Sequence, residues 1–194
     1  MSRRSRSSQP ATAESPGERA ASLTTRRASR RRSSRGEPRP QRVISGGQTG
    51  VDRAALDAAL EAEILIGGWC PCGRRAEDGR IPDRYPLHET PTVAYAERTR
   101  WNVRDADATL IITAGPATGG TALTLRTARE MGRAVEVVDL DRVDSVADEA
   151  ERLRDWLEST GILVLNVAGP RESTAPGIYL RALELLRLRL RRKS

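Results

Sequence analysis

Short apolar runs alternate with helical stretches along residues 41–194. The apolar runs are continuous rather than alternating with polar residues, which is typical of strands that are buried on both faces of a parallel sheet. Strands separated by helices need crossover connections, so the pattern predicts a layered α/β domain. We expect strands at residues 42–45, 64–66, 109–113, 134–140 and 162–167, and helices at residues 51–62, 121–131, 146–159 and 177–191.

Residues 67–91 interrupt this alternation. They contain four Pro and four Gly and show no clear period. A long irregular segment inside a compact domain is usually functional or disordered. We therefore expect an ordered loop that lies beside a functional site.

The net charge of +7 is unevenly distributed along the chain. Residues 1–40 contain 11 Arg and three Glu, whereas residues 41–194 contain 22 basic and 23 acidic residues. The first segment has nine Ser and a single Leu, so it cannot bury enough apolar surface to offset ~1–2 kcal/mol of chain entropy per residue. We predict a disordered Arg/Ser-rich tail over residues 1–40 and a folded domain over residues 41–194. Six Arg lie within residues 26–35, where they either bind a polyanion weakly or only solvate the tail.

Composition argues against several classes of protein. No window contains 18 consecutive apolar residues, so we expect no membrane span, and the first residues have no apolar segment that would suit a secretory signal. Two cysteines cannot build a disulfide framework, which makes a cytoplasmic location the default expectation. The chain has no Phe and six aromatic residues in total, which argues against a surface that stacks nucleic-acid bases.

Two glycine-rich segments each follow an expected strand and open an expected helix. They are residues 45–50 (SGGQTG) and residues 113–121 (TAGPATGGT). Glycine permits positive φ and close approach of a ligand to the backbone, and a helix N-terminus offers free N–H groups and partial positive charge. Neither segment matches GxGxxG or a Walker A loop. Their shared position at strand ends favours an anion-binding crevice over ordinary capped turns.

Two further segments carry arginines that suit an anion. Residues 166–173 follow the last expected strand and include Arg171, whose guanidinium can hold a phosphate through two hydrogen bonds. The loop of residues 72–80 includes Arg74 and Arg75, which either close over the anion or remain solvated. The predicted ligand-binding residues are Ser45, Gly46, Gly47, Gln48, Thr49, Gly50, Arg74, Arg75, Thr113, Gly115, Thr118, Gly119, Gly120, Thr121, Asn166, Gly169 and Arg171.

Metal and nucleophile chemistry have weaker support. Cys70 and Cys72 are separated by one residue rather than by the usual two, so we predict no metal site. His88 is the only histidine, and no motif places it beside a nucleophile. The carboxylates that remain as candidate acid–base groups are Asp52, Asp78, Asp83 and Glu130.

Five strings together cover most of residues 41–194: ISGGQTGVDRAALDAAL (44–60), GGWCPCGRRAEDGRIPDRYPL (67–87), WNVRDADATLIIT (101–113), GPATGGTALT (115–124) and NVAGPRESTAPGIY (166–179). They resemble the molybdenum carrier family, a circularly permuted branch of the Lonely Guy (SLOG) superfamily. The resemblance implies a Rossmann-like three-layer sandwich with a mostly parallel sheet and helices on both faces. It also implies a homo-oligomer that binds the molybdenum cofactor (molybdopterin), a pterin carrying a phosphate and a molybdenum oxo centre. The wider superfamily implies a nucleotide as the alternative ligand.

One departure from the superfamily bears on catalysis. The Lonely Guy hydrolases carry a PGGxGTxxE loop, and Thr124 stands here at the position of its glutamate. A neutral hydroxyl cannot replace a carboxylate as general acid or base. We therefore expect a binding protein rather than an enzyme. Three hypotheses remain: a molybdenum cofactor carrier, a nucleotide sensor or nucleotide-processing hydrolase, and a nucleic-acid-associated protein that uses its basic tail.

Removing residues 1–40 should leave the domain folded, because that segment has no apolar face to add to a core. We expect the Tm of residues 41–194, measured by calorimetry, to lie within a few degrees of that of the full chain. The same deletion should abolish any salt-sensitive DNA binding in fluorescence anisotropy. A larger fall in Tm, or salt-sensitive binding that persists in the shortened chain, would contradict this division.

Overall fold

A five-stranded, fully parallel sheet forms the centre of the computed structural model, which describes residues 39–191. The tail predicted over residues 1–40 lies outside the described residues except for its last two. The strand order is β2-β1-β9-β7-β8. The strands are β1 (Arg42–Ile44), β2 (Leu65–Gly67), β7 (Ala108–Thr113), β8 (Ala134–Asp139) and β9 (Val164–Ala168).

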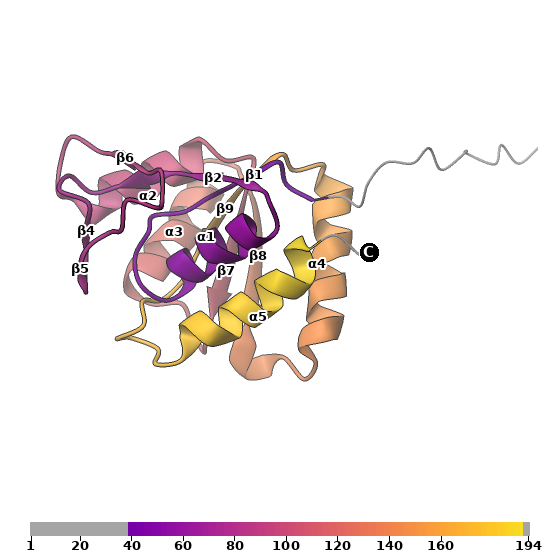
Figure 1. Ribbon diagram of the computed structural model, residues 1–194. Coiled ribbons are helices and arrows are strands. Elements are labelled where there is room, and N and C mark those ends of the chain that lie inside the picture. The colour runs from indigo at the N-terminus through magenta and orange to yellow at the C-terminus, as the bar shows by residue number, and fades with distance from the viewer. Residues whose placement is uncertain (1–38, 192–194) are drawn as a thin grey trace, which may run out of the picture. The chain divides into compact units, whose positions relative to one another are not determined.

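Helices cover both faces of this sheet and complete three layers (Figure 1). In Figure 1, α1 (Val51–Glu61) and α5 (Ile178–Leu190) lie side by side in front of the sheet, and α4 (Val146–Thr160) packs against α5. Behind the sheet, α2 (Tyr95–Arg104) packs against α3 (Gly119–Glu130). This arrangement confirms the Rossmann-like α/β sandwich expected from the sequence. No helix within residues 39–191 is both long and apolar enough to cross a membrane.

The strand order is that of a doubly wound sheet whose first strand has moved to the end of the chain. When the strands are counted from β9, the sheet reads 3-2-1-4-5, the order found in dinucleotide-binding folds. The connection from β1 to β2 and the connection from β7 to β8 run in opposite directions along the sheet. In such folds, ligands bind in the crevice that this divergence opens at the carboxyl ends of the strands.

Small and branched side chains explain the tight packing of the layers. Ala54, Ala55, Ala58 and Ala59 of α1 are fully or almost fully buried, so this helix lies close to the sheet and to α5. All six residues of β7 are buried, as expected for a central strand covered on both faces. The predicted strands and helices agree with the structure to within a few residues at each end.

One helix was missed by the sequence prediction. Helix α2 turns Thr99, Asn102 and Val103 inward, so two of its three buried residues are polar. The apolar spacing that marks a helix in a sequence is therefore absent from this segment.

The irregular segment of residues 67–91 folds into an ordered lobe, as predicted, and contains short strands that its sequence did not reveal. Strands β3 (Trp69–Cys70) and β6 (His88–Glu89) pair in parallel, and β4 (Arg75–Ala76) and β5 (Gly79–Arg80) form an antiparallel hairpin. A small second core holds the lobe against α1; its buried members are Leu56, Cys70, Ile81, Tyr85 and Leu87.

Candidate functional site

A cleft of about 240 Å³ opens at the carboxyl ends of β7 and β9. Four segments enclose it: the start of α3, the loop that follows β9, the first turn of α1, and α2. The residues that line it are Asp52, Arg98, Thr99, Thr118, Gly119, Gly120, Thr121, Thr124, Ala168, Gly169, Pro170, Arg171, Ser173 and Thr174. Six of the predicted ligand-binding residues are therefore brought together here: Thr118, Gly119, Gly120, Thr121, Gly169 and Arg171.

The N-terminus of α3 is open toward this cleft. Thr118 is its N-cap residue but makes no side-chain capping hydrogen bond, and the first turn contains no acidic residue. No atom lies within 4 Å of the Cβ position of Gly119 or Gly120. The first N–H groups of a helix have no partner within the helix, and here they carry the positive end of a 12-residue helix. This end of α3 is suited to hold an anion.

The N-terminus of α1 is closed, in contrast to the prediction for residues 45–50. The N–H of Val51 donates to the carbonyl of Pro170 at 3.3 Å. The Asp52 carboxylate in the first turn accepts from Gln48 N at 3.3 Å, so the helix carries its own negative charge at its positive end. A Cβ on Gly50 would lie 2.5 Å from the oxygen of Pro170. Protein atoms therefore occupy the positions beside the Val51 N–H and the Gly50 Cα, although Thr49 and Gly50 also line a separate cavity beside Arg53.

The other glycines of the first segment are also covered by protein. A Cβ on Gly47 would lie 2.5 Å from Leu87 Cδ1 and 3.1 Å from Ile81 Cδ1. A Cβ on Gly46 would lie 1.3 Å from a terminal nitrogen of Arg98. The close approach that we expected between this loop and a ligand is instead an approach between the loop and side chains of the protein.

Arg98 crosses Gly46 to reach Asp52, and the two form a largely buried ion pair. Arg98 Nη1 lies 2.8 Å from Asp52 Oδ2, and the exposed fractions of the two side chains are 15% and 4%. Both residues line the cleft. The Arg98 guanidinium comes from α2, so the helix that the sequence did not reveal supplies a central group of the site.

Thr124 lies in the same cleft and is buried. Its hydroxyl donates to the carbonyl of Gly120, one turn earlier, at 2.9 Å. The side chain at this position is thus engaged with its own helix.

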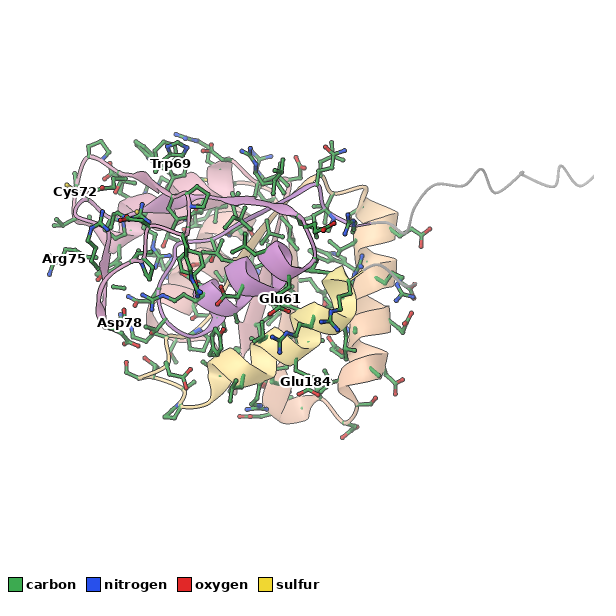
Figure 2. All side chains as sticks on the ribbon, in the orientation of Figure 1. Glu61, Trp69, Cys72, Arg75, Asp78 and Glu184 are labelled. Carbon is green, nitrogen blue, oxygen red and sulfur yellow. The ribbon has the colours of Figure 1, made fainter. Side chains whose placement is uncertain are left out.

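The structure gives Arg74 a different place from the one predicted. Its side chain is buried and donates hydrogen bonds of 2.8–3.2 Å to four backbone carbonyls, those of Ile81, Pro82, Tyr85 and Leu87. Arg74 therefore organises the lobe and has no free face for an anion. Arg75 is exposed at the outer edge of the lobe, on β4 (Figure 2), and does not line the cleft.

Three other predicted residues make internal hydrogen bonds that fix the strand ends. Ser45 Oγ donates to the carbonyl of Val167 at 2.7 Å, Asn166 Nδ2 donates to Thr109 Oγ1 at 3.2 Å, and Thr113 Oγ1 donates to the carbonyl of Gly115 at 2.7 Å. The first contact joins the segment after β1 to β9, the second joins β9 to β7, and the third holds the turn that follows β7. They support the site without lining its wall.

Glu77 joins the three loops around the cleft. Its carboxylate accepts from the hydroxyls of Thr49 and Ser173, and Arg171 Nε lies 3.8 Å from it. Its own N–H donates to Gln48 Oε1 at 2.9 Å. Desolvation raises the pKa of Glu77, but the hydrogen bonds from Ser173 and Thr49, together with the charge of Arg171, outweigh this effect and hold its pKa below the ordinary value.

Asp52 and Arg98 are the charged groups of the cleft that the predicted ligand set omits. The sequence had marked Asp52 only as a candidate acid–base group, and it gave no signal for Arg98. Within residues 39–191, no group of three or more His, Cys, Asp and Glu side chains is arranged to hold a metal ion. Cys70 is buried while Cys72 is exposed.

Comparison with known proteins agrees with this fold. Residues 43–190 match the model of the circularly permutated YpsA SLOG family. The chain is also similar to a crystal structure from Syntrophus aciditrophicus SB, described as that of a putative molybdenum carrier protein. The sequence identity is 48% and the TM-score is 0.77, over 79% of this chain and 96% of that chain. No curated protein matches the chain. The resemblance drawn from the sequence strings is thereby confirmed.

Replacing Arg74 by Ala should destabilise the domain strongly, because four carbonyl oxygens lose their donor. We expect a loss of about 3 kcal/mol or more in the free energy of unfolding, since one unsatisfied buried acceptor costs ~1–3 kcal/mol. The matched control is Arg75→Ala, an exposed neighbour, which should change stability by less than about 0.5 kcal/mol. Urea unfolding measures both, and equal losses would show that Arg74 does not organise the lobe.

The stability that Glu77 contributes should depend on pH. Because its folded pKa lies below 4.5, its contribution is present above that pH and is lost as the pH falls through the lowered value. We expect wild type to be more stable than Glu77→Gln at neutral pH, and this difference to shrink as the pH falls through the lowered pKa. The control is Glu63→Gln, at an exposed glutamate. Unfolding free energies of the three proteins across this range test the point, and a difference that does not change with pH would contradict it.

Proposed function

Because the chain belongs to the circularly permutated YpsA SLOG family, we propose that its domain binds a small phosphorylated molecule in the cleft. We further propose that this molecule is the molybdenum cofactor, held as cargo rather than as a resident catalyst. The similarity to the Syntrophus protein, described as a putative molybdenum carrier, supports this ligand. The proposal for a phosphate rests on the geometry of the cleft.

The observation that carries the phosphate proposal is the open end of α3. Its free N–H groups face a cleft that Arg98 and Arg171 also line. Arg98 Nε is buried and has no hydrogen-bond acceptor within residues 39–191. A buried donor without an acceptor is costly in a protein alone, and an oxygen-rich anion would supply the acceptors. Helix end and guanidinium groups together are a recurring way to hold phosphate.

The groups of the cleft suit binding better than hydrolysis in the manner of the Lonely Guy enzymes. Thr124 offers no carboxylate, and its hydroxyl is bonded to Gly120. The metal would be held by the pterin itself, since residues 39–191 offer no metal-binding group of three or more side chains. A nucleotide is the second candidate ligand, because Asp52 places one carboxylate in the same cleft.

Gly120→Val should remove the bound ligand while leaving the fold intact. The Cβ position of Gly120 is open and its φ is not positive, so the branched side chain extends over the helix end that would hold the phosphate. The matched control is Arg126→Val, which places the same side chain at an exposed position further along α3 and costs under about 1 kcal/mol in helix propensity.

The measurement is the ligand content of the purified proteins, by mass spectrometry for the organic part and by elemental analysis for molybdenum. We expect a pterin phosphate and molybdenum in wild type and in Arg126→Val, and at least about tenfold less of both in Gly120→Val. A nucleotide in their place would favour the second candidate. Equal content in all three proteins would exclude the α3 end from the site.

A further inference from the structure

We propose that Asp52 recognises the ring of the ligand by accepting hydrogen bonds from a ring N–H and the adjacent exocyclic amine. This donor pair is shared by guanine and pterin rings. The inference rests on the proposed function, because it assigns the other end of the same ligand to a named side chain. It names the chemical class of the ring that is attached to the phosphate proposed at the N-terminus of α3.

The first support is the unused acceptor capacity of Asp52. An ionised carboxylate offers about four acceptor positions, and two are taken, by Arg98 Nη1 at 2.8 Å and by Gln48 N at 3.3 Å. Both donors bind Oδ2. Within residues 39–191, no hydrogen bond is made to Oδ1. Both remaining positions are on Oδ1, so this one oxygen would accept from the ring N–H and the exocyclic amine together.

The second support is where this carboxylate lies. Asp52 is 3% exposed and lines the cleft, so its free oxygen faces a confined space rather than bulk solvent. Asp52 Oδ1 is not buried without a partner, so this oxygen can be reached from the cleft. A ligand that supplies N–H groups there would complete the hydrogen bonds of the carboxylate.

Two positive groups lie next to Asp52. Arg98 pairs with it, and the positive end of α1 lies beside it. A charged carboxylate donates no hydrogen bond, so it discriminates against ring edges that present acceptors.

The cleft therefore offers both donors and acceptors to a ligand. The start of α3 and Arg171 offer donors for an anion, whereas Asp52 offers only acceptors. Its volume of about 240 Å³ is below the ~300–1,000 Å³ of drug-sized pockets, which suits a compact monophosphate. A guanine or pterin monophosphate has an anionic end and a donor-rich edge. Hypoxanthine lacks the exocyclic amine, and adenine presents an acceptor beside its amine.

The test is a calorimetric comparison of GMP, IMP and neopterin monophosphate with the purified full chain. GMP and IMP differ only in the exocyclic amine, so their ratio of Kd isolates the contact with Asp52. We expect both GMP and neopterin monophosphate to bind about 10–100-fold more tightly than IMP. If GMP has the lower Kd of the two, the ring is that of a nucleotide; if neopterin monophosphate has the lower Kd, the ring is a pterin.

The variant arm uses Asp52→Asn, with Asp57→Asn as its matched control. Asp57 lies in the same helix and also accepts buried hydrogen bonds, from Tyr85 and Tyr179, but it does not line the cleft. We expect Asp52→Asn to bring the GMP to IMP ratio close to one and Asp57→Asn to leave it unchanged.

The wild-type ratio decides the question even if Asp52→Asn fails to fold. Equal binding of GMP and IMP by wild type would overturn the assignment of Asp52 and leave the phosphate proposal standing. Binding of none of the three compounds would overturn both. A high ratio that persists in folded Asp52→Asn would also overturn the assignment.

Discussion

The contact between the loop after β1 and the loop after β9 is the constraint on which the site depends. They touch at Gly50, and the β9 loop also packs against strand β7 at Gly169. A Cβ on Gly50 would lie 2.5 Å from the Pro170 oxygen, and a Cβ on Gly169 would lie 2.2 Å from the Ile112 oxygen. Backbone thus packs directly on backbone, which only glycine permits at such distances. Because of this contact, α1 starts against the β9 loop and presents Asp52 to the cleft.

The same contact gives two similar helix ends opposite electrostatic roles. Both α1 and α3 follow glycine-rich segments at the carboxyl ends of parallel strands. At α1, a backbone oxygen and the Asp52 carboxylate satisfy the helix end from within the protein. At α3, neither an acidic residue nor a side-chain cap is present. The cleft therefore has free donors at the start of α3 and a carboxylate acceptor, Asp52, at the start of α1.

The sequence predicted the sheet and four of the five long helices because apolar runs and their spacing mark buried faces. It missed α2, whose buried residues include Thr99 and Asn102, and with it Arg98. It also assigned Arg74 to an anion, although this residue adopts a φ of 51° and binds four carbonyls of its own lobe. Composition cannot distinguish an arginine that binds carbonyls from one that binds a ligand, because both depend on contacts between residues brought together only by folding.

Because of the permuted strand order, the cleft forms only after β9 has joined the sheet. Strand β9 lies between β1 and β7 although it is the last strand along the chain, so the pairs β2-β1 and β7-β8 are joined only by it. Ser45 Oγ then reaches the Val167 carbonyl across 122 residues of chain, and such distant contacts form late because their loops cost entropy to close. The strand that completes the sheet also carries the loop with Gly169, Pro170 and Arg171. Completion of the core and assembly of the cleft are therefore one event. The N-terminus of α3 and the Asp52 carboxylate come together only in the finished fold.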